Sequence, residues 1–208
     1  MTKSEQIEQL NRELENASKD LPIVRGPKDI VPGEGNAEAE LLFIGEAAGR
    51  NEAIQRRPFV GVAGQLLDKI LIENNFQRKD VYISNIVKAR PPSNRDPMPE
   101  EIEAFCPYLD KEIEIIDPKL IITLGRFSMG KFIPGARISH IHGRLHQVKF
   151  LGKHRYVLPF FHPAAALRQP VVMDQFMKDF TKIRKILEYI DSKKEEIVLL
   201  EHIEETLL

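Results

Sequence analysis

The sequence predicts a three-layer α/β/α sandwich with a central, mostly parallel sheet of four to five strands. Short apolar runs such as LLFI and IITL lack alternation, which is typical of strands buried on both faces. Between these runs lie segments whose apolar residues recur at helical spacing. Strands that alternate with amphipathic helices favour parallel pairing, with the crossover helices covering both faces of the sheet.

The N-terminal segment is expected to form a helix followed by an arm. Ile7, Leu10 and Leu14 recur at helical spacing, so a helix is predicted over residues 4–17. Residues 18–38 contain three prolines and three glycines, which indicates an extended arm. The apolar residues available to pack this arm on the body are Leu21, Ile23, Val24, Ile30 and Val31.

The core alternates between the two kinds of element. β-Branched apolar runs predict strands, and apolar residues three and four apart predict helices. The proline-rich residues 91–99 cannot form regular structure. The predicted strands are residues 39–45, 80–89, 118–125, 144–150 and 155–161. The predicted helices are residues 64–75, 100–116, 126–133 and 171–190.

The length of 208 residues suits one domain with a single core. We divide it into residues 1–38 (helix and arm), 39–190 (core) and 191–208 (an acidic C-terminal helix). Hydrophobic residues make up 42% and charged residues 29%, as in soluble globular proteins. No apolar run reaches membrane-spanning length, and the N-terminus is too polar for a signal peptide. We therefore expect a cytoplasmic, nucleoid-associated monomer with no membrane contact.

Charge is segregated along the chain although the net charge is only −1. Residues 121–185 contain twelve Lys and Arg but only two Asp, whereas acidic residues gather in residues 99–117 and 186–208. Such a distribution is compatible with a basic face for a phosphate backbone. A solvated surface with chance clustering explains the charges equally well.

Polar side chains follow three of the predicted strands. Glu46, Asn85 and His162 come directly after apolar runs, and Phe59 lies on a nearby loop. The carboxyl ends of parallel strands share one edge, where open sheets form their sites. An aromatic face, an amide and an imidazole suit a planar heterocycle, because they can stack on the ring, pair with its edge and donate to a ring oxygen. Taken singly, each residue also has a purely structural explanation, so their convergence is what predicts the site.

Four motifs carry a family resemblance: GEAAGRNEAIQRRPFVGVAGQLLDKIL, VYISNIVKARPPSNRDPMPEEIEAFCPYL, PKLIITLGRFSMGKF and HPAAALRQP. With these motifs in order, residues 39–186 resemble the family 4 uracil-DNA glycosylases. The resemblance implies an α/β/α fold and a monofunctional DNA-repair enzyme. Such an enzyme flips uracil out of single- or double-stranded DNA and hydrolyses its N-glycosidic bond, leaving an abasic site.

The resemblance also implies roles for individual residues. A loop over residues 45–49 would position water, Phe59 would stack on the flipped uracil, and Asn85 would read its Watson–Crick edge and exclude cytosine. His162 would donate to uracil O2. The implied catalytic residues are Glu46, Glu52 and His162, and the implied uracil-binding residues are Ala47, Phe59 and Asn85.

Further residues match the DNA-binding side of the family. Asn94 and Arg95 match a DNA-side loop. Leu167 would fill the gap left by the flipped nucleotide, and Arg168 would sit near a phosphate. An ordinary loop hydrophobe and a solvated charge are the simpler explanations of these last two residues.

A histidine cluster at residues 140, 142 and 146 surrounds Arg144. The spacing of the histidines could suggest a metal, but no carboxylate or cysteine accompanies them. We therefore expect a DNA-facing loop that includes Arg144, and no metal site.

The cysteine content departs from the family. Family 4 enzymes normally hold a [4Fe–4S] cluster on four cysteines, but this chain has only Cys106, with Ala89 where the family has a cysteine. One thiolate cannot hold a cubane cluster. We therefore expect no cluster and no other cofactor, with Cys106 as a small buried hydrophobe.

Two alternative functions remain open. A relative that acts on hypoxanthine or xanthine is less well matched, because the Asn85 amide suits a pyrimidine edge. A catalytically inactive DNA-binding relative would not need the three strand-end residues. A nucleotide-binding module is disfavoured because the G-x-G-x-x-G and P-loop patterns are absent. Ala165 and Ala166 stand where bulkier residues are common, which suggests a preference for single-stranded or mismatched uracil.

Overall fold

A six-stranded sheet runs through the centre of the computed structural model, which describes residues 1–193. The strand order is β1-β3-β2-β4-β6-β5, and the four inner strands are parallel while both edge strands pair antiparallel. The extra strand β1 comes from the arm, where only two residues pair with β3. The strands are β1 (Glu34–Gly35), β2 (Leu41–Ala47), β3 (Tyr82–Val87), β4 (Leu120–Leu124), β5 (His146–Phe150) and β6 (Lys153–Phe160).

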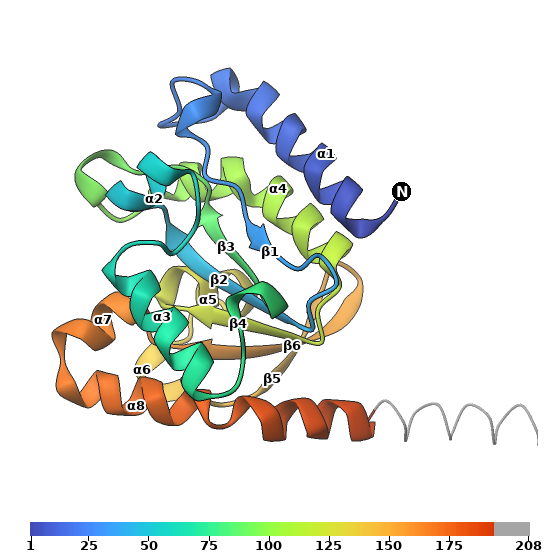
Figure 1. The fold of residues 1–208 in the computed structure, drawn as a ribbon, viewed down its shortest axis with the longest axis vertical. Helices are drawn as coiled ribbons and strands as arrows, with labels where there is room; N and C mark the ends of the chain where they lie inside the picture. Colours follow the sequence, from blue (N-terminus) through green and yellow to red (C-terminus); the bar gives the residue numbers. More distant parts are fainter. Residues whose placement is uncertain (194–208) are drawn as a thin grey trace, which may run out of the picture.

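Helices cover both faces of the sheet, which confirms the three-layer α/β/α prediction (Figure 1). Helices α1 and α4 pack on one face with the arm, and α3 and α8 pack on the other. The long C-terminal helix predicted over residues 171–190 is interrupted by a turn at residues 181–182. The helices are α1 (Lys3–Asn16), α2 (Arg50–Gln55), α3 (Val62–Glu73), α4 (Pro99–Ile116), α5 (Arg126–Phe132), α6 (Ile138–Ile141), α7 (Pro163–Arg168) and α8 (Pro170–Phe180).

The buried strands explain why the sequence shows continuous apolar runs. Along β2, Leu42 and Ile44 join the core beneath α1 and α4, whereas Leu41 and Phe43 join the core beneath α3 and α8. All four side chains are buried. A strand that is covered on both sides needs apolar residues at successive positions, so alternation disappears.

The arm packs on the body largely through the residues expected from the sequence. Leu21, Ile30 and Val31 are buried, while Ile23 and Val24 are only half-buried against the same core. Besides β1, the arm contains a 3₁₀ turn at Pro27–Asp29, and a second turn at Ala17–Asp20 leads into it. It is therefore less extended than predicted.

A buried ion pair joins the residue that follows β3 to α4. The side chains of Lys88 and Glu112 are 1% and 0% exposed, and Nζ lies 2.6 Å from Oε2. Ser84 Oγ donates to the same carboxylate oxygen at 2.7 Å and accepts from Lys88 Nζ at 2.6 Å. Burial, together with this nearby carboxylate, raises the pKa of Tyr82 well above its ordinary value. The arm is tied to this network because the Val31 N–H donates to the Lys88 carbonyl at 2.8 Å.

The surroundings of Cys106 differ from the prediction of a small buried hydrophobe. Its side chain is only half-buried, and Sγ accepts a hydrogen bond from Lys131 Nζ at 3.3 Å. The same ammonium pairs with Asp110 at 2.6 Å, so a charged neighbour explains the difference. Ala89 is fully buried, and the sequence contains no second thiol. These residues do not fit a cubane cluster, which needs four ligands.

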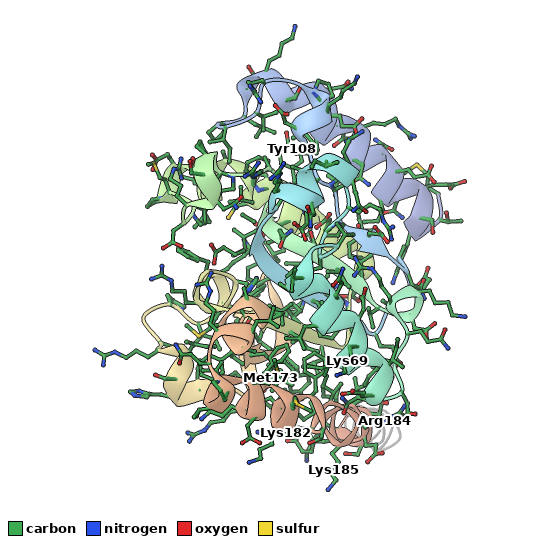
Figure 2. All side chains as sticks on the ribbon, turned by 60° about the vertical axis from the view of Figure 1, so that its left-hand side comes forward. Lys69, Tyr108, Met173, Lys182, Arg184 and Lys185 are labelled. Atoms are coloured by element: carbon green, nitrogen blue, oxygen red, sulfur yellow. The ribbon has the colours of Figure 1, made fainter. Side chains whose placement is uncertain are left out.

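Many cations of the basic segment are paired with acids in the structure. Some of these lysines and arginines pair with Asp110 or Asp117 in the acidic α4 region, and others pair with Asp174 or Asp179 of their own segment. Arg184 and Lys185 on the C-terminal helix, and Lys182 in the turn before it, lie on the outer side of the protein (Figure 2). The pairs are Lys131–Asp110, Lys153–Asp117, Arg155–Asp117, Lys178–Asp174, Lys182–Asp179 and Arg126–Asp96.

The predicted acidic tail helix lies outside the described residues from residue 194 onward. Residues 191–193 continue the helix that begins at residue 183. In the described part of the chain, no helix combines the length and the apolar character needed to cross a membrane.

Candidate active site

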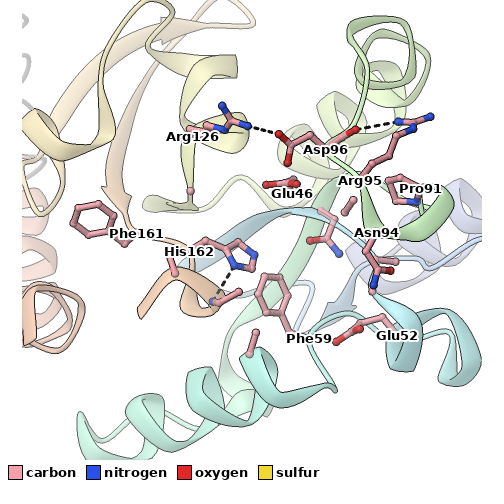
Figure 3. A pocket seen from close by; sticks show the side chains of 18 of the residues that line it. Glu46, Glu52, Phe59, Pro91, Asn94, Arg95, Asp96, Arg126, Phe161 and His162 are labelled. Carbon is pink, nitrogen blue, oxygen red and sulfur yellow. Dashed lines mark hydrogen bonds and ion pairs between the residues drawn. The ribbon is translucent and has the colours of Figure 1, made fainter. Parts of the chain in front are cut away.

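A pocket of about 510 Å³ opens at the edge of the sheet where the parallel strands end (Figure 3). Strand β2 contributes Glu46 and Ala47, β3 contributes Asn85, and His162 follows β6. Phe59 reaches the pocket from the loop between α2 and α3. Together with Glu52, which also lines the pocket, all six predicted catalytic and uracil-binding residues meet here.

Asn85 lies inside β3 (Tyr82–Val87), within the strand predicted over residues 80–89. The side chain is buried, and Oδ1 has no hydrogen-bond partner among the described residues. An unpaired buried polar atom is unfavourable by about 1–3 kcal/mol. The amide is therefore available to a ligand in the pocket.

His162 joins β6 to α7, where a loop was predicted. Its Nδ1 accepts a hydrogen bond from the Ala164 N–H at 3.1 Å and so caps the helix. Burial lowers the pKa of His162 to about 4, and the Arg168 charge adds to this effect while Glu52 opposes it. The imidazole is therefore neutral near pH 7, with its proton on Nε2 as an available donor. The Phe59 ring lies 5.7 Å away between centroids (Figure 3).

Glu46 is half-buried at the end of β2. Burial raises the pKa of Glu46; the nearby Asp96 raises it further, and Arg126 lowers it. Asp96 and Arg126 form an ion pair at the pocket, and their side chains are 64% and 63% exposed (Figure 3). The carboxylate thus sits in a setting that can hold and polarise a water molecule.

Glu52 contacts the backbone around Phe59. Its Oε1 accepts the N–H of Val60 at 3.0 Å and the N–H of Gly61 at 2.7 Å. These hydrogen bonds fix the loop that carries Phe59, and they occupy one of the two carboxylate oxygens.

The sequence profile of the uracil DNA glycosylase superfamily matches residues 32–190. The chain belongs to this superfamily. It is 39% identical to the type-4 uracil-DNA glycosylase of Archaeoglobus fulgidus, over 88% of this chain and 94% of that protein. The type-4 uracil-DNA glycosylase of Saccharolobus solfataricus is 45% identical over 77% of each chain. That of Sulfurisphaera tokodaii is 46% identical over 75% of this chain and 74% of its own length. The predicted resemblance is thereby confirmed.

Three of the residues predicted to face DNA line the pocket, and two do not. Asn94, Arg95 and Arg168 line the pocket, but the Arg95 guanidinium is paired with the Glu101 carboxylate. Leu167, on α7, is 44% exposed. The structure does not bring the exposed Arg144 into the pocket lining.

One member of the histidine cluster, His142, is engaged within the protein. His142 Nδ1 lies 2.6 Å from Asp179 Oδ2 on α8, and its ring lies 4.6 Å from that of Phe161 between centroids. His146 belongs to the edge strand β5. In residues 1–193, no group of three or more His, Cys, Asp or Glu side chains is arranged to hold a metal.

Several pocket residues of this superfamily member were missed by the sequence analysis. Asp96 follows Arg95 in the proline-rich loop, and Arg126 follows the glycine that ends β4. Arg126 directly follows a predicted strand end, so the edge rule could have found it, whereas Asp96 lies further along the proline-rich loop. Ile138 begins α6 and Phe161 follows β6; they carry no such signal, because an apolar side chain at these positions resembles an ordinary core residue.

Proposed function

We propose that the chain is a monofunctional DNA-repair glycosylase that flips uracil out of DNA and hydrolyses its N-glycosidic bond, leaving an abasic site. The observation that carries this function is the meeting of Phe59, Asn85 and His162 in one pocket. Membership of the superfamily and the type-4 uracil-DNA glycosylases at 39–46% identity support it.

Base recognition rests on Phe59 and Asn85. The phenyl face stacks on the flipped base, as aromatic side chains do with every base. The amide of Asn85 donates to uracil O4 and accepts from N3–H. Cytosine presents the opposite pattern at these two positions, so an amide held in this orientation excludes it. The unpaired Oδ1 of Asn85 supports this role, because uracil supplies the missing donor.

Bond cleavage rests on His162 and Glu46. As the glycosidic bond breaks, the sugar gains oxocarbenium character and negative charge develops on uracil O2. The Nε2–H of neutral His162 donates to this oxygen and stabilises the charge. Glu46 orients a water molecule, and its carboxylate favours the cationic sugar. Water adds its oxygen to the anomeric carbon, and its released proton neutralises the uracil anion.

Glu52 acts in this scheme through the backbone of the Phe59 loop. Its hydrogen bonds to the Val60 and Gly61 N–H groups support a positioning role. Ala47, beside Glu46, lines the pocket with a side chain small enough to leave room for a base.

DNA contact is assigned to the rim of the pocket. Exposed Leu167 fills the gap left by the flipped nucleotide, and Arg168 contacts a flanking phosphate. Asn94 and Arg95 lie on the opposite loop, where Glu101 offsets the charge of the arginine. We assign Arg144 to more distant backbone contacts. The partner is uracil-containing DNA, single- or double-stranded, and the protein acts as a cytoplasmic, nucleoid-associated monomer.

The proposed reaction uses no cofactor. Each step is assigned to side chains of the pocket. The single cysteine of the chain cannot supply the four thiolates of an iron–sulfur cluster. Packing of the arm through Leu21, Ile30 and Val31 takes the structural place of such a cluster.

A base-excision assay tests this function. Labelled oligonucleotides carry uracil, hypoxanthine, xanthine or thymine, single-stranded or paired, and alkali cuts the abasic sites. We expect cleavage only with uracil, and its loss in the His162→Ala and Asn85→Ala variants. His154→Ala, which alters an exposed histidine near the start of β6, serves as a matched control with unchanged activity. Folded protein that releases no base would contradict the glycosylase and leave a DNA-binding relative.

A further inference from the structure

Phe59 has an unusual backbone conformation for an aromatic residue. Its φ is +51°, in the left-handed region that bulky side chains rarely adopt. The residue is nevertheless only 5% exposed and belongs to the core beneath α3 and α8. A Cβ at Gly64 would come closer than 3.0 Å to the Phe59 backbone, so only a glycine fits at that position. Such a conformation persists only where surrounding contacts enforce it.

Arg78 holds the carbonyl side of this loop. Its Nη1 donates to the Phe59 carbonyl at 3.0 Å, and its Nη2 donates to the Pro58 carbonyl. Nη1 also donates to Asp68 at 2.8 Å, which fixes the guanidinium. The side chain is only 20% exposed. A planar guanidinium can serve two neighbouring carbonyls at once, which a lysine ammonium does less well.

The other side of the loop is held by Glu52, which accepts the next two N–H groups along the chain. Four successive residues, 58–61, therefore each have a backbone group bound by a charged side chain. The two charged groups are of opposite sign, as the carbonyl and N–H groups require.

The N-terminal arm also contacts Arg78 and the residues just before Phe59. Glu34 of β1 accepts hydrogen bonds from Arg57 Nε at 2.7 Å and Nη2 at 2.6 Å, and its carboxylate lies 3.8 Å from Arg78 Nε. The Arg56 Nε donates to the Ile30 carbonyl at 3.1 Å. The segment that leads into Phe59 is thus attached to the N-terminal arm.

We propose that Arg78 is a positioning residue for base recognition, which sets the Phe59 ring through the carbonyls of residues 58 and 59. The proposal rests on the proposed function of Phe59 as the stacking residue. Arg78 does not line the pocket, so its influence on the base passes through the loop.

Single-turnover excision with enzyme in excess over a uracil oligonucleotide tests this role. We expect Arg78→Ala to lower the rate constant at least tenfold and Arg78→Lys to restore it in part. With enzyme in saturating excess, a partial loss of folded protein leaves the rate constant unchanged, so a lower rate constant reports on the folded enzyme itself. Arg184→Ala is the matched control, because Arg184 also donates to a loop carbonyl, that of Asn75 at 3.0 Å, away from the pocket. Its rate constant should stay within twofold of the wild type.

Hydrogen exchange of the peptide spanning residues 57–64 gives a readout that does not depend on activity. Arg78→Ala should speed exchange of the amides held by Glu52 and leave α4 peptides unchanged. In an active wild-type protein, an unchanged rate constant for Arg78→Ala would overturn the proposal, whatever the exchange. Wild-type protein that excises no uracil would refute the proposed function instead. In that case unchanged exchange would overturn the role of Arg78 as well, and faster exchange would support it.

Discussion

Gly45 and Asn85 are register partners on two adjacent parallel strands, and Asn85 occupies the space that a side chain at Gly45 would need. A Cβ at Gly45 would lie closer than 3.0 Å to Asn85 Oδ1 and to the ring of Phe59. Two of the proposed base-recognition groups therefore meet over the bare backbone of a single glycine.

Gly45→Ala should abolish base recognition with a limited effect on folding. The added methyl group displaces either Asn85 or Phe59, so we expect excision to fall at least 100-fold. Overpacking of this kind costs about 1–3 kcal/mol of unfolding free energy. Single-turnover kinetics and urea denaturation measure the two effects. Gly130→Ala is the control, because its Cβ would meet nothing within 4 Å, and excision should stay at the wild-type rate.

Asn85→Ala should reduce excision without destabilising the protein. Two hydrogen bonds to uracil are lost, which corresponds to about 100-fold in rate. The free energy of unfolding should change by less than about 1 kcal/mol, because no hydrogen bond of the buried Oδ1 is broken. The neighbouring Ser84→Ala, which removes a hydroxyl bound to Lys88 and Glu112, should be clearly destabilised. Equal destabilisation of the two variants would argue against a ligand-directed amide.

Glu46→Gln should stabilise the protein at neutral pH while impairing excision. The pKa of Glu46 is raised above 4.5 in the folded state, so ionisation opposes folding. The protonated carboxyl contributes its full share of the unfolding free energy below pH 4.5, the value for the unfolded chain, and this contribution is lost as the pH rises through the raised pKa. The melting temperature of the variant should therefore exceed that of the wild type at pH 7, and the difference should shrink towards pH 4. A variant that melts lower at pH 7 would contradict the burial argument.

His162 should make the wild type sensitive to acid. Its pKa is lowered to about 4, so the neutral form is favoured by folding. This stability is present above pH 6.5 and is lost as the pH falls towards 4, because the unfolded chain takes up the proton first. At pH 4.5, we expect the wild type to lose about 2 kcal/mol more than His162→Gln, relative to pH 7. Urea denaturation at both pH values measures this difference, and parallel losses would refute it.

Lys88→Met should be strongly destabilising, since it leaves the Glu112 carboxylate buried without its partner. Breaking a buried ion pair from one side costs about 3–5 kcal/mol. The double variant Lys88→Met/Glu112→Leu should recover most of this loss, which distinguishes an unpaired charge from a packing defect. Lys178→Met, which breaks an exposed pair with Asp174, should change the unfolding free energy by less than about 0.5 kcal/mol.

The sequence predicted the inner strands and the edge at which the pocket forms. Glu46, Asn85 and His162 could be brought together in advance because the ends of parallel strands coincide in space. The helix after His162 was missed, since six residues between two prolines carry too little periodicity to be recognised. Strand β1 was missed for a similar reason, because its pairing depends on β3 and not on its own two residues.

Pairs that join distant loops could not be predicted from one sequence. Asp96 and Arg126 are thirty residues apart; Asp96 lies in the proline-rich loop and Arg126 begins α5, and neither segment shows that the two side chains meet. The hydrogen bond from Arg78 to the Phe59 carbonyl likewise depends on how the loop folds over α3. Tertiary geometry decides these contacts, and local pattern carries no signal for them.

The capping of α7 by His162 has a consequence for repeated catalysis. The nitrogen that would take up a second proton is already bound to the Ala164 N–H, so the imidazole stays in one neutral tautomer. In the proposed reaction, its Nε2–H donates a hydrogen bond to the departing base without transferring the proton. The residue is therefore unchanged at the end of each cycle, and the next round does not wait for the surrounding buffer to recharge it.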